Sequence, residues 1–132
     1  MSIYKQPNVN PMKKLLFALI MLMPLAIFAQ SQSEMNAQAA KDYKNADAEL
    51  NKVYQQVMKK YAENTLFIKE LKAAQQLWVQ FRDAEFKRAY PHYNEGNTYY
   101  GSVFSLDKST FLEKMTTERT KTLKEILKIG PN

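Results

Sequence analysis

The chain has 132 residues, of which 19 are basic, 13 are acidic and none is cysteine. This length suits one compact domain rather than two, and the lack of cysteine excludes disulfides, thiolate chemistry, thiolate metal sites and a lipid-modified export anchor. Basic and acidic residues alternate along the chain without the concentrated basic stripe of a nucleic-acid binder, so we expect no nucleic-acid partner.

Residues 1–29 have the pattern of an N-terminal extension followed by a secretory signal peptide. Lys13 and Lys14 precede an apolar run of 14 residues, which is shorter than the about 20 residues of a bilayer span. Ala29 then supplies a small residue for cleavage. The pattern predicts an exported protein, periplasmic or secreted, that is soluble and keeps no stable membrane anchor after cleavage.

Two consequences follow for the rest of the chain. Met12 also has the context of an initiator, so we expect residues 1–11 to lie upstream of the true start. Removing the three lysines of the N-terminal segment leaves 16 basic and 13 acidic residues in residues 30–132, a net charge of +3.

The sequence pattern of residues 30–132 predicts a single all-α domain with three main helices. The first is expected to begin at the capping box Ser31–Glu34, and apolar positions three and four residues apart then define one face. The second is expected to begin after a cap at Asn64 and to end near Ala89, because Pro91 disfavours a helical residue before it. Its predicted core face carries Phe67, Leu71, Ala74, Trp78 and Phe81.

The third helix is expected to begin at Thr110, where Thr110–Glu113 forms a second capping box, and to stop at Gly130 and Pro131. Residues 103–109 are ambiguous between a loop and a short helical turn. The stretch 91–102 is the one long loop, rich in tyrosine and glycine. Short connections elsewhere predict a small antiparallel bundle or an open helical arrangement.

Polar residues on the apolar faces of all three helices predict a structural network. A buried charge is costly unless it is paired, so we expect the polar groups to meet between helices. An aspartate facing an arginine would provide bidentate geometry. The alternative is that the same groups contact a ligand. The residues concerned are Asp47, Asn51, Gln75, Arg82, Asp83 and Arg119.

The long loop is the candidate partner-binding surface, because tyrosine offers a large contact area at a low entropic cost. The alternative interpretation is that two or three of its rings fold back and cap the end of the core. The tyrosines in this loop and directly before it are Tyr90, Tyr93, Tyr99 and Tyr100.

No catalytic, metal or cofactor site is predicted. The carboxylates of Asp83 and Glu85 diverge on a helix, and His92, the one histidine, is expected to have no acid near it. No serine has a nucleophile-elbow context, and no spacing of histidines and acids resembles a metal site.

A wider set of residues resembles the LprI-type lysozyme-inhibitor family of small exported bacterial proteins. The matching segments cover nearly all of residues 30–132 and read QSEMN at 32–36, ADAELN at 46–51, LKAAQQLW at 71–78, FRDAE at 81–85 and MTTERT at 115–120. The resemblance implies an exported helical domain that binds lysozyme by non-covalent protein–protein contact.

The resemblance also implies cysteines at the positions of Gln38, Phe86 and Phe111, all of which are absent here. Phe86 and Phe111 are expected to replace a cross-link by apolar packing. Lysozymes of animals are strongly cationic, so a local acidic group is needed to attract them to a basic domain. Glu95 is the acid in the loop. The hypothesis is therefore a lysozyme-inhibitor-like binding protein, and the alternative is an envelope module for another extracellular protein or a cell-wall glycan.

Overall fold

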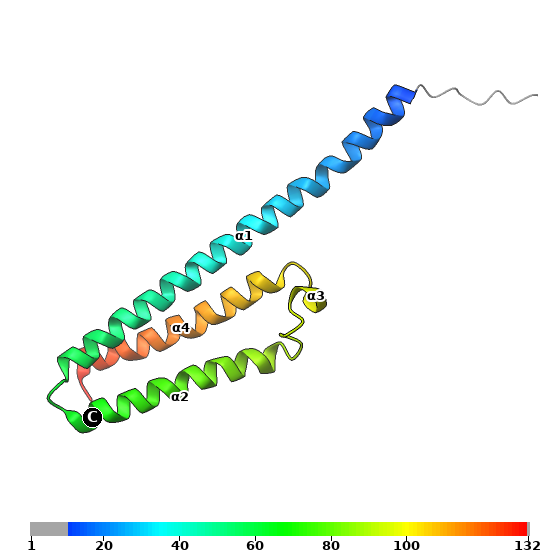
Figure 1. The fold of residues 1–132 in the computed structure, drawn as a ribbon. Helices are drawn as coiled ribbons and strands as arrows, with labels where there is room; N and C mark the ends of the chain where they lie inside the picture. The colour runs from blue at the N-terminus through cyan, green and yellow to red at the C-terminus, as the bar shows by residue number, and fades with distance from the viewer. Residues whose placement is uncertain (1–10, 132) are drawn as a thin grey trace, which may run out of the picture. The chain divides into compact units, whose positions relative to one another are not determined.

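The computed structural model describes the backbone of residues 11–131 and the side chains of residues 31–131. Within this part the chain forms helices and no strand, which confirms the all-α prediction. The helices are α1 (Pro11–Lys60), α2 (Thr65–Ala89), α3 (Asn97–Tyr100) and α4 (Phe104–Ile129) (Figure 1).

The chain divides into two units, Met1–Glu34 and Met35–Asn132. In the first unit, residues 11–34 are helical. The predicted extension and signal peptide of residues 1–29 lie outside the residues whose side chains are described. None of the helices, as far as the structure describes them, combines the length and the apolar character needed to cross a bilayer.

In the second unit, three long helices lie side by side (Figure 1). Helix α2 runs antiparallel to the other two, and α4 runs in the same direction as the second half of α1. Where α1 ends, beside the C-terminal end of α4, Tyr61 donates a hydrogen bond to the carbonyl of Ile126 at 3.0 Å. Lys60 donates to the carbonyl of Leu127. At the opposite end the Asn36 amide donates to the carbonyl of Ser102 at 3.2 Å. These contacts join α1 and the residue that follows it to the last turn of α4 and to the residues just before α4.

The core of this unit is built from one face of each long helix. Fully burying a leucine or valine side chain stabilises a domain by about 1.5–3 kcal/mol, and the predicted apolar faces supply such residues from all three helices. The main cluster consists of Leu50, Val53, Val57, Leu71 and Leu123, each at most 5% exposed.

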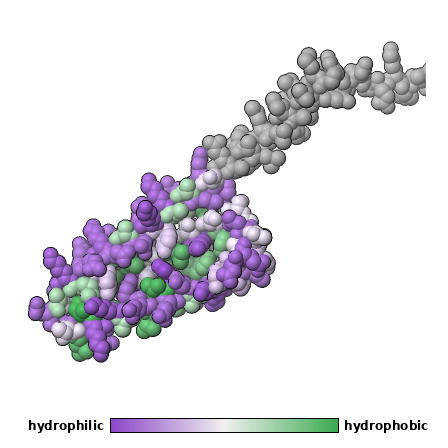
Figure 2. Space-filling model, in the orientation of Figure 1, coloured by the Kyte–Doolittle hydropathy of each residue, from purple (hydrophilic) through white to green (hydrophobic). Residues whose placement is uncertain are grey.

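Two predicted core positions are wrong. Ala74 is exposed. Phe81 is 56% exposed, and Leu77, one turn earlier, is 64% exposed. At 100° per residue, Phe81 lies about 60° from Trp78 around the helix, toward the exposed Leu77. Arg82 lies about 40° from Trp78 in the opposite direction and takes the inward position, with 13% of its side chain exposed. Figure 2 shows hydrophobic colour reaching the surface along the edge that α2 forms.

The helix ends confirm some sequence signals and contradict others. Asn64 caps α2, its side-chain oxygen accepting from the amide of Phe67 at 3.1 Å, and Gly130 ends α4 with a φ of 83°. The two predicted capping boxes are wrong. Helix α1 continues through Ser31, and α4 begins at Phe104 rather than at Thr110. Most helical stability comes from packing rather than from local signals. Phe104 is buried, so packing accounts for the earlier start of α4.

Candidate partner-binding site

The loop after α2 is folded rather than extended. Tyr90 ends α2, donating its amide to the carbonyl of Phe86 at 2.9 Å, and the short helix α3 then reverses the chain. Gly96 and Gly101 flank α3 with φ values of 50° and 80°. Residues with a side chain rarely adopt such positive φ values. A Cβ at Gly96 would lie 3.3 Å from the Phe104 ring. Glycine there allows the loop to approach the core closely.

Two of the predicted contact tyrosines belong to an aromatic cluster beneath the loop. The Tyr90 ring centroid lies 5.1 Å from Phe86, 5.5 Å from Tyr100 and 5.7 Å from Phe104. Tyr100 stacks on Phe104 at 5.2 Å. Burial raises the pKa of the Tyr90 phenol, and the charge of Asp107 adds to this rise. These rings cap the core, as the alternative interpretation of the loop proposes.

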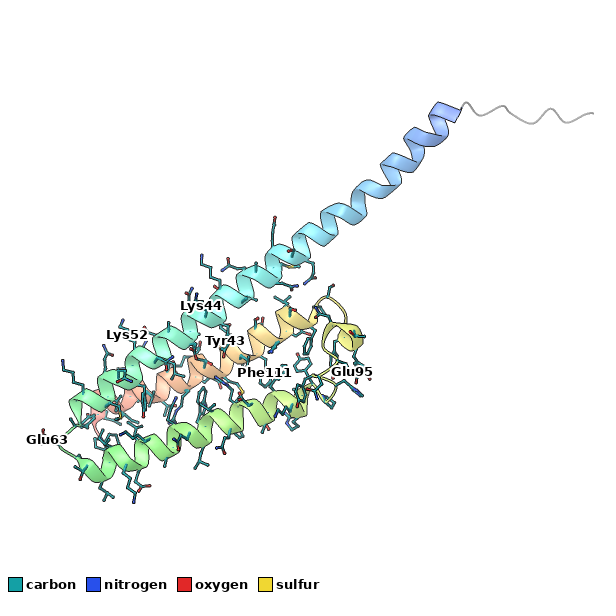
Figure 3. All side chains as sticks on the ribbon, in the orientation of Figure 1. Tyr43, Lys44, Lys52, Glu63, Glu95 and Phe111 are labelled. Carbon is teal, nitrogen blue, oxygen red and sulfur yellow. The ribbon has the colours of Figure 1, made fainter. Side chains whose placement is uncertain are left out.

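The exposed tip of the loop centres on Tyr99, which is 55% exposed. Its ring stacks on the imidazole of His92, with centroids 3.9 Å apart. The Nδ1 atom of His92 lies 2.8 Å from the Glu95 carboxylate, so the expectation that no acid lies near His92 is wrong. The His92 amide also donates to the Tyr100 hydroxyl at 3.0 Å. These contacts hold the tip against the aromatic cluster, with Glu95 on its outer side (Figure 3).

Tyr93 lies between the cluster and the surface. It is half-buried, with its ring 6.4 Å from Phe86 and the Lys87 ammonium 5.5 Å from its centroid. Together with Phe86 and Lys87 it lines an open groove of about 230 Å³ between α2 and α4, whose other wall includes Lys108. The groove is also lined by Asp83, so this side of the loop presents two lysines and one carboxylate beside an aromatic ring.

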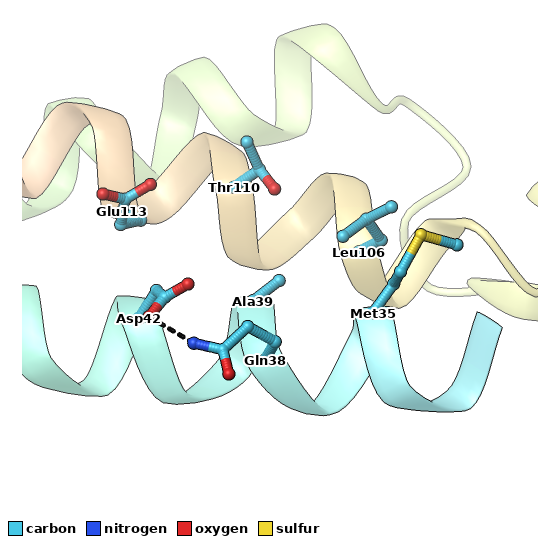
Figure 4. A pocket seen from close by; sticks show the side chains of 7 residues that line it. All are labelled: Met35, Gln38, Ala39, Asp42, Leu106, Thr110 and Glu113. Carbon is cyan, nitrogen blue, oxygen red and sulfur yellow. Dashed lines mark hydrogen bonds between the residues drawn. The ribbon is translucent and has the colours of Figure 1, made fainter. Parts of the chain in front are cut away.

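An acidic groove lies on the other side of α4 (Figure 4). It is open, has a volume of about 270 Å³ and is lined by no basic residue. Its apolar wall comes from Met35, Ala39 and Leu106, and its carboxylates are Asp42 and Glu113. The Gln38 amide, also in the groove, donates to Asp42 at 2.8 Å, and the remaining lining residue is Thr110.

The chemistry of this groove suits a lysine or arginine side chain. Its apolar wall can cover the aliphatic stem, while the carboxylates face the charged head. The groove adjoins the loop, because the Asn36–Ser102 contact ties this end of α1 to the residues just before α4. The apolar residues that α1 contributes to the groove lie on a helix face that the sequence predicted. The residues from α4 could not be assigned to the groove, because that helix was predicted to begin only at Thr110.

The predicted polar network is present as separate pairs. The Arg119 Nε donates to the Gln75 Oε1 at 3.0 Å and joins α4 to α2. The expected carboxylate partner is thus replaced by an amide. Arg119 forms no ion pair among the residues with described side chains, and burial lowers its guanidinium pKa.

The other polar pairs lie within single helices. Arg82 contacts the adjacent Asp83 at 2.9 Å, and Asn51 donates to Asp47 at 3.2 Å. An interhelical ion pair that the sequence did not reveal joins Lys124 to Glu49 at 2.8 Å.

In the described part of the chain, no cluster of three or more histidine or acidic side chains could hold a metal ion. The arrangement of the loop offers an aromatic surface with charged flanks, which is suited to binding.

Comparison with known proteins identifies a family. The family model described as "Lysozyme inhibitor LprI" matches residues 26–123. An uncharacterized protein of Rhizobium meliloti (strain 1021) is 31% identical, and the alignment covers 79% of each chain. No solved structure matches.

Proposed function

Because the chain belongs to the LprI lysozyme inhibitor family, we propose that it is an exported protein that inhibits a lysozyme by non-covalent contact. The family match carries this proposal, since it spans most of the α-helical domain together with the loop. No residue of the chain needs to react in this function, and no cofactor is required. Export would follow from the N-terminal segment predicted to be a signal peptide.

We assign the contact to the exposed tip of the loop and the acidic groove beside it. Tyr99 provides the aromatic anchor, and its stacking on His92 keeps the ring in place before binding. A contact that is ordered in advance loses less conformational entropy on association. Tyr90 and Tyr100 support this surface from below, and Tyr93 lies at its edge.

Charge selects the side of the loop that faces a cationic lysozyme. The Lys87 and Lys108 side would repel such a partner, whereas Asp42 and Glu113 offer carboxylates to a lysine or arginine. Glu95 adds a third carboxylate at the tip. Complementary local charge accelerates association even when the net charges of the two proteins are alike.

The test is a muramidase assay on a peptidoglycan suspension. The full chain is expressed, and the purified product is titrated against a cationic lysozyme at low and physiological salt. We expect inhibition in a 1:1 ratio. Tyr99→Ala should weaken it about ten-fold or more, because a central aromatic anchor contributes more than about 1.4 kcal/mol.

The groove is tested by Asp42→Asn combined with Glu113→Gln, which should weaken inhibition most at low salt, where charges are least screened. The matched control is Glu63→Gln combined with Glu118→Gln, two exposed acids away from the loop. It makes the same change in net charge and should leave inhibition unaltered. A product that is folded by circular dichroism but does not inhibit would contradict the proposal and favour another envelope partner.

A further inference from the structure

The outward face of α2 carries an apolar patch that the candidate binding site does not use. Leu77 is 64% exposed and Phe81 is 56% exposed, one turn apart on the same side of the helix. Ala74 and Ala84, both exposed, extend the patch in either direction. Large apolar side chains scattered singly on a surface are ordinary, whereas contiguous exposed apolar patches with a polar rim are typical of interaction surfaces.

Residues of opposite charge lie at the two ends of this patch. Glu70 lies two turns before Leu77 and Arg88 lies two turns after Phe81, and 64% and 69% of their side chains are exposed. At 100° per residue both charges project in the same direction as the midpoint of the apolar pair. The Glu85 carboxylate contacts Nε and Nη2 of Arg88, which leaves Nη1 available for a second carboxylate.

The order acid, small, large, large, small, base is self-complementary when the helix is reversed. The positions 70, 74, 77, 81, 84 and 88 are symmetric about position 79. An antiparallel copy of α2, related by a two-fold axis at that point, therefore places each group opposite its complement. This is the isologous arrangement that most homodimers use.

We propose that a second copy of this chain occupies the face, with the two α2 helices antiparallel. Leu77 then packs on Phe81 of the second copy, and the alanines allow the helices to approach closely. Glu70 pairs with Arg88 of the second copy at each end. A parallel pair would instead place Glu70 against its own copy, so the charges select the antiparallel arrangement.

The interface is small, because each copy contributes only two large apolar side chains. Interfaces of this size belong to the weak and reversible class. We expect a dimer in rapid equilibrium with the monomer, with a dissociation constant in the micromolar to submillimolar range.

Sedimentation equilibrium of the purified product of the full chain, over a range of concentrations, tests the proposal. Leu77→Gln combined with Phe81→Gln should raise the dissociation constant at least ten-fold without lowering the melting temperature. The matched control is Ile129→Gln, which polarises a side chain that is 77% exposed on α4. It should leave the dissociation constant unchanged.

A charge-swap pair tests the antiparallel register. Glu70→Arg and Arg88→Glu each put like charges together and should each weaken self-association. Mixed in equal amounts, the two variants should recover a heterodimer, because each arginine then meets a glutamate of the other variant. A monomeric parent protein, a dimer unaffected by the glutamines, or a mixture without recovery would overturn the proposal. Inhibition of lysozyme is measured separately, and its failure would not bear on self-association.

Discussion

A single hydroxyl group in α4 offers a sharp test of the packing. Thr116 is fully buried, and its Oγ1 atom has no hydrogen-bond partner among the residues whose side chains the structure describes. Thr120, one turn later, is 5% exposed, but its hydroxyl donates to the carbonyl of Thr116 at 2.9 Å. The two residues thus share a helix, a residue type and a buried environment, and they differ in whether the hydroxyl is satisfied.

The expected effect of Thr116→Val follows from this difference. A buried hydroxyl without a partner costs about 1–3 kcal/mol, and a methyl group in its place adds up to about 0.8 kcal/mol of apolar burial. Valine and threonine have similar helix propensities. We therefore expect the free energy of unfolding to rise by about 1–2 kcal/mol. For a domain of this size, that corresponds to an increase in melting temperature of about 4 °C or more.

The assay is thermal and urea unfolding followed by circular dichroism. Thr120→Val is the matched control, because it loses a hydrogen bond worth about 0.5–1.5 kcal/mol and gains the same methyl group. It should be no more stable than the parent protein. A Thr116→Val protein that is equal to or less stable than its parent would show that the hydroxyl is satisfied. Equal stabilisation by both variants would attribute the gain to the methyl group alone.

The loop and an interhelical ion pair give two more predictions. Gly96→Ala should destabilise the domain by about 1–3 kcal/mol. The loss should exceed that of Gly101→Ala, because only the alanine at position 96 also crowds Phe104; chemical unfolding of the two variants gives both values. The hydrogen bond from Lys124 holds the pKa of Glu49 below its ordinary value. The contribution of the ionised Glu49 to stability is thus present at neutral pH and lost as the pH falls below about 5. Glu49→Gln should therefore lose less stability on acidification than the parent protein. Parallel curves of stability against pH would refute this.

The ends of α2 were predictable from the sequence, whereas the start of α4 was not. Asn64 can cap a helix with its own side chain, and Pro91 restricts its neighbour through local sterics, so both act without the rest of the fold. The motif at Thr110 is just as local, yet it lies inside α4. The helix is extended back to Phe104 by packing against aromatic rings from α2 and the loop, and no local pattern records that contact.

The candidate site was predictable in its residue types but not in its geometry. Sequence composition identified the tyrosine loop, but only the fold separates Tyr99 at the surface from Tyr90 in the aromatic cluster. Asp42 and Glu113 come from helices far apart in the chain, and their shared groove depends on the parallel course of α1 and α4. For the same reason a charged partner was predicted for Arg119, whereas the register between α2 and α4 brings the Gln75 amide to it.

The aromatic cluster explains how the tyrosine-rich loop is held in place without cysteines. Phe86 and Phe111, which the family resemblance places at cysteine positions, lie in edge-to-face contact with ring centroids 5.7 Å apart. A disulfide would form a direct link between only two residues. These rings also contact Tyr90, at 5.1 Å and 6.4 Å, and thereby fix the residue at which the loop begins. The loop is consequently ordered by the folding of the core itself, and its order depends on the stability of the domain rather than on an oxidising compartment.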